Sequence, residues 1–354
     1  MPLKSPHKSF YYTNDECTLL QRLQYSHQHF SKRNKFLLQA KMDKLRPSPI
    51  LLFNDKQMEN VRKVFNYEDV NKLKQDLDNL EDWIRKQNHF VVKEFDRKYL
   101  ERLLLSSKGS VEITKKRFDR LCTMRKIMPE MLKNIDMKNE FISLHKWHRY
   151  CVLPKPTSDN YRVIIASIYN PNELECIEFF DMYRYLVSMF YYFFNRDYNA
   201  GYEYIFDARN YTFGVVTKLN PLIMHKVASV FLEAIGVRLK CLHMISGSKL
   251  FDTILSFVKQ ALTEKLVKRI VIHDSVESLH KYISKEILPV DFQGDEKSIA
   301  ELSEANFKEL CTEEHIQFLK TLDKAETDES LRLSDKSDAE FMGMPGSFKT
   351  LSID

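Results

Sequence analysis

The sequence predicts an α/β protein in which a small helical domain precedes a domain with a mixed or parallel sheet. Two observations carry this prediction. In residues 68–139, apolar side chains recur at the three- and four-residue spacing of helices. After Pro154 and Pro156, short β-rich runs alternate with helical segments over about 140 residues. Such alternation is typical of a sheet that is covered by helices.

Length and composition fit a folded protein of roughly two domains, since 354 residues carry 44% hydrophobic and 29% charged side chains. The longest uncharged stretch of the most apolar region, residues 185–195, is much shorter than the roughly 20 residues of a membrane-spanning helix. Residues 1–9 lack the apolar segment of a secretory signal, so we expect a cytoplasmic protein. The six cysteines form no C-x-x-C pair, which argues against a zinc knuckle and a redox dithiol.

The first expected segments are an accessory arm, residues 1–60, and a helical lobe, residues 61–140. The arm mixes Pro, Ser and Lys and contains one predicted helix, at about residues 15–42, which ends before Pro47. In the lobe, only Gly109 and Pro129 interrupt the helical spacing.

The α/β domain is expected over residues 141–294. Its predicted strands are residues 161–168, 202–207, 239–245 and 269–273, and its predicted helices are residues 173–195, 221–235 and 250–268. Residues 295–354 hold 7 basic and 15 acidic side chains. There we expect one or two weak helices and, from about residue 325, a disordered acidic tail.

The common catalytic and nucleotide motifs are missing from the sequence. It contains no glycine-rich phosphate loop and no G-x-S-x-G nucleophile elbow. His145, His148 and Cys151 are spaced three apart on a predicted helix end but lack an acidic fourth ligand. We therefore expect no enzyme, no metal and no cofactor. The net charge of +5 comes without a nucleic-acid-binding motif, so no nucleic acid partner is expected, while a basic patch facing an anionic membrane stays open.

Large apolar side chains are concentrated at the centre of the α/β domain. The helix at residues 173–195 is apolar nearly all round and includes Tyr183, Val187 and Tyr191. Tyr202, Tyr204 and Phe206 share one face of the next strand. Two interpretations remain open: a well-filled core, or a closed apolar cavity for a ligand of lipid size.

Several motifs, in the same order along the chain, resemble those of the CRAL-TRIO (Sec14-like) lipid-binding family. Residues 242–270, LHMISGSKLFDTILSFVKQALTEKLVKRI, are similar to the family's strand and mobile gate helix. The others are GYEYIFD (201–207), LNP (219–221), LPVDFQG (288–294) and, in the lobe, LEDWIRKQ (80–87). The resemblance covers residues 60–294 and is greatest to the tocopherol-transfer and retinaldehyde-binding branch.

This resemblance implies a Sec14-like domain in which a sheet forms the floor of a lipid pocket and a gate helix forms its lid. Carried over by position, the pocket would be lined by Ser188, Tyr202, Phe206, Val230, Phe231, Ile235, Val237 and Leu242. The inner face of the gate would comprise Phe251, Ile254, Leu255, Val258 and Leu262, a stripe that helical spacing also predicts. The family's usual Pro, Pro and Gly are replaced by Gly236, Gln260 and Gln293.

The resemblance also implies a phosphoinositide site at Arg238, Lys240, Lys265 and Arg269. Arg238 and Lys240 alternate with apolar residues, so a strand would turn both charges away from the pocket. The alternative is four ordinary surface cations.

The expected function is that of a carrier: we expect one lipophilic molecule, such as a retinoid or tocopherol, to be held in a gated pocket. The carrier would be a cytoplasmic monomer that associates transiently with phosphoinositide-containing membranes. A lipid-sensing regulatory module without net transfer is the alternative. An enzyme acting on lipids is disfavoured by the missing nucleophile and metal motifs.

Overall fold

The computed structural model describes residues 45–332 apart from residue 248. The chain divides into two compact units, Met1–Arg46 and Pro47–Asp354, and the following description concerns the second. The helix predicted at residues 15–42 and the tail at residues 333–354 lie outside the described residues. Within these, no helix is long and apolar enough to span a bilayer.

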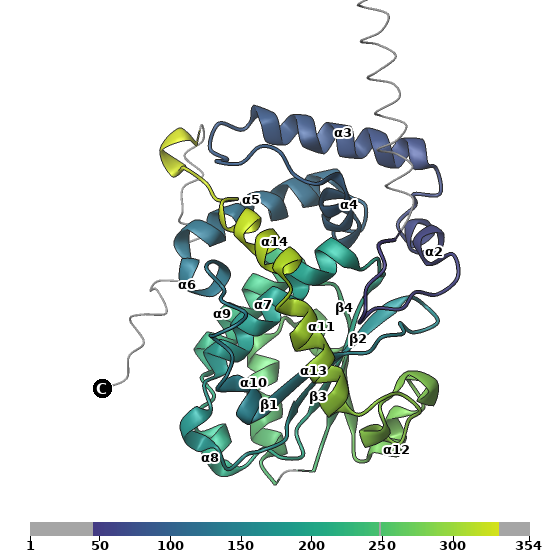
Figure 1. The fold of residues 1–354 in the computed structure, drawn as a ribbon, viewed down its shortest axis with the longest axis vertical. Helices are drawn as coiled ribbons and strands as arrows, with labels where there is room; N and C mark the ends of the chain where they lie inside the picture. Colours follow the sequence, from purple (N-terminus) through teal and green to yellow (C-terminus); the bar gives the residue numbers. More distant parts are fainter. Residues whose placement is uncertain (1–44, 248, 333–354) are drawn as a thin grey trace, which may run out of the picture. The chain divides into compact units, whose positions relative to one another are not determined.

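Helices α2 to α6 form the lobe that precedes the sheet (Figure 1). Helix α3 buries Leu73, Leu77 and Leu80 on one face, as the spacing predicts. It starts after Asp69, whose carboxylate accepts a hydrogen bond from the backbone N–H of Asn71. The lobe helices are α2 (Gln57–Val64), α3 (Val70–Lys86), α4 (Arg97–Ser106), α5 (Val111–Ile127) and α6 (Pro129–Leu132).

The arm predicted for residues 1–60 is packed against the rest of the chain where it is described. Ile50 and Leu51 are buried, and the backbone N–H of Leu52 donates to the carbonyl of Pro154 at 2.8 Å. The predicted boundary at residue 60 falls inside α2, which Gln57 joins to the α/β domain by donating to the carbonyl of Tyr198 at 2.6 Å.

A five-stranded mixed sheet forms the centre of the α/β domain and confirms the predicted fold class. The strand order is β1-β2-β3-β4-β5; β1 is antiparallel to β2 and the remaining pairs are parallel. The strands are β1 (His148–Val152), β2 (Tyr161–Ile168), β3 (Gly201–Asp207), β4 (Leu239–Ile245) and β5 (Ile270–His273). Strand β1 replaces the helix end that was expected around His148.

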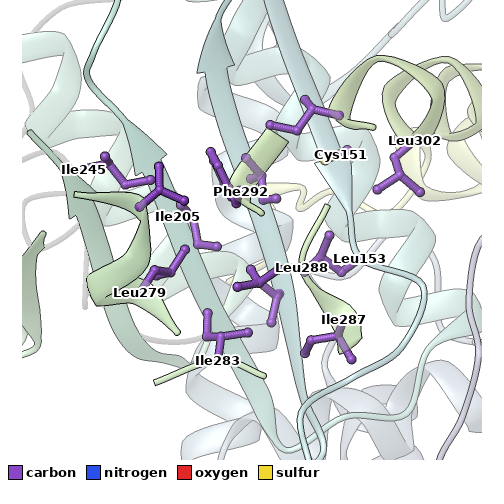
Figure 2. Packing of buried hydrophobic residues seen from close by; sticks show 14 residues of the cluster. Cys151, Leu153, Ile205, Ile245, Leu279, Ile283, Ile287, Leu288, Phe292 and Leu302 are labelled. Atoms are coloured by element: carbon purple, nitrogen blue, oxygen red, sulfur yellow. The ribbon is translucent and has the colours of Figure 1, made fainter. Parts of the chain in front are cut away.

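One face of the sheet packs against segments from the C-terminal side of the domain. Ile205 and Ile245 contribute to a buried cluster with Leu279, Ile283 and Phe292 (Figure 2). The segments on the C-terminal side are α12 (Val276–Leu279), η4 (Lys285–Ile287), η5 (Val290–Phe292) and α13 (Ile299–Leu310).

The helices beside the other face are shorter than predicted, because each predicted segment is divided. Residues 173–195 form η2 (Leu174–Cys176) and α7 (Phe179–Arg196). Residues 221–235 form α9 (Pro221–Ser229) and a π-helix, η3 (Val230–Ile235). The predicted gate forms α10 (Phe251–Ala261) and α11 (Glu264–Val267), which are separated by extended backbone at Leu262 and Thr263. The short α8 (Phe213–Val216) follows β3.

The C-terminal segment returns to the lobe, where a disordered tail from about residue 325 was expected. After α14 (Glu313–Asp323), Thr327 pairs with Phe90 in a β-bridge. After η6 (Glu329–Leu331), the Arg332 guanidinium donates to both carboxylate oxygens of Asp119 at 2.9 Å. These contacts order the chain up to Arg332.

Candidate functional site

An apolar cavity of about 210 Å³ lies between β3, β4 and helices α7, α9 and α10. None of its described lining side chains is charged, and among them only Tyr183 and Tyr204 bear a hydroxyl. The lining comprises Tyr183, Leu186, Phe190, Tyr204, Phe206, Met224, Val227, Ala228, Phe231, Leu232, Val237, Leu239, Leu242, Val258, Ala261 and Leu262. Such a wall suits a hydrophobic molecule that has at most one small polar end.

Local periodicity explains how the elements supply this wall. Tyr183, Leu186 and Phe190 follow the three- and four-residue spacing of one face of α7. Tyr204 and Phe206 are two apart on β3, so their side chains point to the same face of the sheet. Both are only partly buried, because they face the cavity.

The structure brings part of the predicted pocket together. The predicted residues that line the cavity are Tyr183, Tyr204, Phe206, Phe231, Val237 and Leu242, with Val258 and Leu262 from the predicted gate. Sequence reasoning missed Leu186 and Phe190 as lining residues, although both lie on the aromatic helix. It also missed Met224 and Val227, which only the fold brings next to the sheet.

The other side of α7 faces away from the cavity. The hydroxyl of Ser188 is 2.8 Å from His315 Nε2 on α14, so the structure does not place Ser188 in the cavity as the resemblance implied. The ring of Tyr191 lies 5.3 Å from the guanidinium carbon of Arg125 in the lobe. Val187 is fully buried but is not a lining residue. Helix α7 is apolar nearly all round, so spacing alone does not identify its cavity face.

The remaining residues predicted for the pocket and the gate are buried behind the side chains that line the cavity. The ring of Tyr202 packs against Phe190 at a centroid distance of 4.9 Å. Val230 and Ile235 are fully buried in η3 without reaching the cavity. The gate residues outside the lining, all buried on α10, are Phe251, Ile254 and Leu255.

The two lining hydroxyls belong to a group of neighbouring tyrosines. Burial, followed by the nearby phenols of Tyr150, Tyr211 and Tyr183, raises the pKa of Tyr204 far above its usual value. Burial is also the main cause of the raised pKa of Tyr183. Both phenols are therefore neutral at physiological pH and can donate or accept a hydrogen bond.

A second hollow, of about 350 Å³, adjoins the cavity and is called the basic cleft below. It shares the cavity's wall at Ala228, Leu232, Val237, Leu239, Ala261 and Leu262. Its cations are Lys108, Arg117, Arg238, Lys265 and Arg269. The carboxylate among the described lining residues, Glu233, lies 2.6 Å from Arg120 and is thus already paired.

The charges in the basic cleft are incompletely balanced. The pKa of Lys108 is lowered, chiefly by the positive charge of Lys265 and then by burial, Arg238, Arg269 and Arg117. Burial is the main cause of the lowered pKa of Arg238, whose buried Nη1 has no hydrogen-bond partner. Several converging cations with a spare donor would suit a multivalent anion such as a phosphate group.

Three of the four predicted phosphoinositide-site cations meet in this cleft, and Lys240 does not. Lys240 Nζ lies 3.5 Å from Asp159 and 3.8 Å from Glu203. The pairing of β3 with β4 explains this separation, because Tyr202 is opposite Leu239 and Glu203 is opposite Cys241. Lys240 is the extra residue of a β-bulge, which interrupts the simple alternation of side chains. Lys108 and Arg117 were missed because they come from the distant lobe.

The three residues considered as metal ligands are divided between two elements, with His145 in η1 (Leu144–Lys146) and with His148 and Cys151 on β1. Across the described parts of the chain, no group of three His, Cys, Asp or Glu side chains is arranged to hold a metal ion.

Residues 146–294 match the family model of the CRAL/TRIO domain, and residues 69–142 match that of the Pinta-like UBA domain. "Alpha-tocopherol transfer protein-like" of Mus musculus is 25% identical over 115 residues, which are 32% of this chain and 33% of that protein. "Clavesin-2" of Homo sapiens is 30% identical over 95 residues, 27% of this chain and 29% of that protein. The chain thus spans about a third of the length of these curated relatives.

Among solved structures, the crystal structure of Sfh5 matches 76% of this chain and 97% of its own chain, with a TM-score of 0.45 and 13% identity. The motifs at residues 201–207 and 288–294 both fall within the matched CRAL/TRIO segment, which contains the whole five-stranded sheet. By this match, residues 146–294 form a CRAL/TRIO domain.

Proposed function

We propose that the chain binds one lipophilic molecule in the apolar cavity and carries it between membranes. The observation that supports this most is the uncharged lining of the cavity. Each buried CH₂ group contributes about 0.8 kcal/mol, so a ligand with a dozen carbons could derive most of its affinity from burial. The name of the tocopherol-transfer-like relative agrees with a ligand of the tocopherol type.

The neutral hydroxyls of Tyr183 and Tyr204 suit a ligand whose polar end is an alcohol or a carbonyl group. A carboxylate or phosphate there would be desolvated without a cation among the described lining residues. The headgroup of a charged lipid is better accommodated in the basic cleft, on the other side of the shared wall.

Entry of the ligand would require α10 to move. The cavity of about 210 Å³ is smaller than the roughly 300–1,000 Å³ of typical small-molecule sites. Val258 and Leu262 close it from the side of the predicted gate. Movement of α10 and the backbone at Leu262 would widen the cavity and uncover an apolar surface that a membrane could cover.

The same proposal places a phosphoinositide headgroup in the basic cleft. Lys108 and Lys265 are exposed there, and no carboxylate pairs with them in the described contacts. Leu222, which is 69% exposed, lies one turn of α9 from His225 in the cleft wall and could enter the bilayer beside the headgroup.

The cavity is tested with Phe206→Asp, which puts a charge into an uncharged wall. We expect this variant to lose loading with retinol or tocopherol, whereas Phe206→Leu should keep most of it. Mass spectrometry of organic extracts from each protein after incubation with these lipids measures loading. If the wild type takes up neither lipid at micromolar concentration, or if Phe206→Asp loads as well as Phe206→Leu, the carrier proposal fails.

The basic cleft is tested with the double variant Lys108→Ala and Lys265→Ala. Each cation near an anionic surface contributes about 1 kcal/mol, so the pair should weaken binding to phosphoinositide vesicles by more than tenfold at low salt. The difference should shrink as salt rises. Lys240→Ala is the matched control, because Lys240 lies outside the cleft. Equal losses in both proteins would contradict the assignment of the headgroup to the cleft.

Transfer of loaded ligand between vesicle populations then separates the carrier from a lipid sensor. A carrier delivers ligand to acceptor vesicles faster than spontaneous exchange does. A sensor loads with ligand, does not accelerate transfer, and binds a partner protein only when loaded.

A further inference from the structure

A chain of polar side chains crosses the sheet face opposite the cavity. Glu203 Oε2 lies 3.2 Å from His243 Nε2, and His243 Nδ1 lies 2.9 Å from His273 Nε2. His273 Nδ1 lies 2.9 Å from the hydroxyl of Ser278, which is 2.8 Å from the carbonyl of Ser275. Glu203, His243 and His273 are buried. The strand register puts all three on the face that also carries Ile205 and Ile245.

The number of hydrogens needed for these hydrogen bonds determines the net charge of the linked side chains. Four hydrogen bonds link the five groups, and each bond needs one hydrogen. Two neutral imidazoles and one hydroxyl supply only three when Glu203 is ionised. One further proton, placed on His243, completes the set: its two N–H groups donate to Glu203 and His273, His273 donates to Ser278, and Ser278 donates to Ser275. The four contacts are thus satisfied together when the hydrogen-bonded chain holds one extra proton.

The surroundings favour this placement of the proton. Glu203 is the carboxylate in contact with His243, although Lys240 Nζ also lies 3.8 Å from its other oxygen. Burial and then His243 lower the pKa of His273 to about 4, while Asp274 acts in the opposite direction. Cys241 Sγ lies 3.9 Å from His243 Nδ1, and the ring of Tyr282 lies 5.5 Å and 5.4 Å from the two imidazoles.

This hydrogen-bonded chain of side chains joins β4 and β5, the two strands that flank the predicted gate. Strand β4 ends at Ile245 and β5 begins at Ile270, so α10 and α11 lie in the connection between them. At the base of this connection, the backbone N–H and the hydroxyl of Ser246 both donate to the carbonyl of His273, at 2.9 Å and 3.1 Å.

We propose that Glu203, His243, His273 and Ser278 form a proton-dependent clasp that ties β4 to β5 at the base of the gate. With the extra proton bound, all four hydrogen bonds form. As pH rises and the proton leaves, one bond is lost and the strands are held less firmly. The role of α10 as a gate above this clasp rests on the proposed function, whereas the proton count and its effect on the strands do not.

The proton count is tested by nuclear magnetic resonance of the full chain with ¹⁵N-labelled histidine, using variants to assign the rings. We expect one doubly protonated ring, that of His243, at pH 6, and its loss as the pH is raised. Ser278→Ala leaves two bonds between Glu203 and the rings, which two neutral imidazoles can supply, so this variant should lose the proton at a lower pH. Glu203→Gln should do the same.

His280→Gln is the matched control, since His280 bonds to the carbonyl of Phe292 outside the clasp. It should leave the titration of His243 unchanged. Neutral rings at both positions at pH 6, or an unchanged titration in both Ser278→Ala and Glu203→Gln, would overturn the proposal.

The effect on the strands is tested by hydrogen exchange of the amides of Leu242 and Ser246, each corrected for its intrinsic rate. In the wild type, protection should fall about three- to tenfold from pH 6 to pH 8, which corresponds to the loss of one hydrogen bond. In Ser278→Ala, the protection of these amides should stay nearly the same from pH 6 to pH 8. Equal pH dependence in the two proteins would overturn the clasp. Because neither measurement uses a ligand, failure to load lipid would contradict only the proposed function.

Discussion

Ser188 is the residue whose environment differs most from what the family resemblance implied. It lies in the middle of α7 and is fully buried, but its hydroxyl meets His315 of α14 and not the cavity. Burial lowers the pKa of His315 to about 3, so the imidazole is neutral. Its contact with Ser188 is therefore a hydrogen bond between neutral groups that joins α7 to α14.

Replacing Ser188 with Ala should affect stability and leave ligand loading unchanged. The variant leaves a buried imidazole nitrogen without its partner, which costs about 1–3 kcal/mol of the free energy of unfolding. Denaturant unfolding measures this loss, and Ser256→Ala, at an exposed position on α10, is the control. If the variant unfolds like the wild type but no longer loads lipid, Ser188 acts in the pocket and the prediction is wrong.

Among the elements, the strands were easier to predict than the site. The apolar runs of β2 and β4 have the predicted bounds, because parallel strands covered on both faces have nearly continuous apolar sequences. Strand β1, HRYCV, is a short edge strand whose residues carry no such signal. The bulge at Lys240 could not be predicted from the sequence either, since it depends on the pairing of β4 with β3.

The site was only partly predictable, because it too depends on how segments that are distant in the sequence pack together. Helical spacing identifies Val258 and Leu262 as members of one stripe of the gate segment. It cannot say which face of α7 meets them, because α7 is apolar nearly all round and its orientation depends on where α14 packs. Nor can it bring Lys108 of the lobe next to Lys265, which follows 157 positions later.

Helix α10 should enter the bilayer when the protein exchanges ligand. In Val258→Trp, the new indole replaces a cavity-lining side chain, so bromine-labelled lipids should quench it only after α10 opens. We expect quenching with phosphoinositide vesicles that donate ligand and little with neutral ones. Ser256→Trp, on the exposed face of the same helix, serves as the comparison. No quenching of the indole at 258 during measured ligand uptake would contradict a moving gate.

At the scale of the whole described unit, the C-terminal segment connects the two domains of the chain. Helix α13 packs against β1 and α14 packs against α7, both in the α/β domain. The following residues then reach the lobe, where the backbone N–H of Asp328 donates to the carbonyl of His89 at 2.7 Å. The segment therefore contributes to the relative position of the lobe and the sheet, and with it to the basic cleft that both supply.

The last contact of this segment should make the stability of the unit depend on pH. Arg332 donates to both oxygens of Asp119, at 2.9 Å each. Burial alone would raise the pKa of Asp119, but hydrogen bonds from His89 and Arg332 outweigh it and the pKa is lowered. A carboxyl whose pKa is lower in the folded state stabilises that state above its unfolded pKa of about 4, and this contribution disappears as the pH falls through the folded pKa.

Arg332→Ala should therefore reduce the free energy of unfolding by about 1.5–3 kcal/mol at pH 7, the range for hydrogen bonds to charged groups. The difference from the wild type should decrease below about pH 4, as Asp119 becomes protonated in both proteins. Denaturant unfolding at several pH values measures it, with Lys308→Ala at an exposed position on α13 as the control. A difference that stays constant down to about pH 2 would mean that the charge of Asp119 contributes nothing to the effect of Arg332, because charge pairing with Asp119 requires the ionised carboxylate.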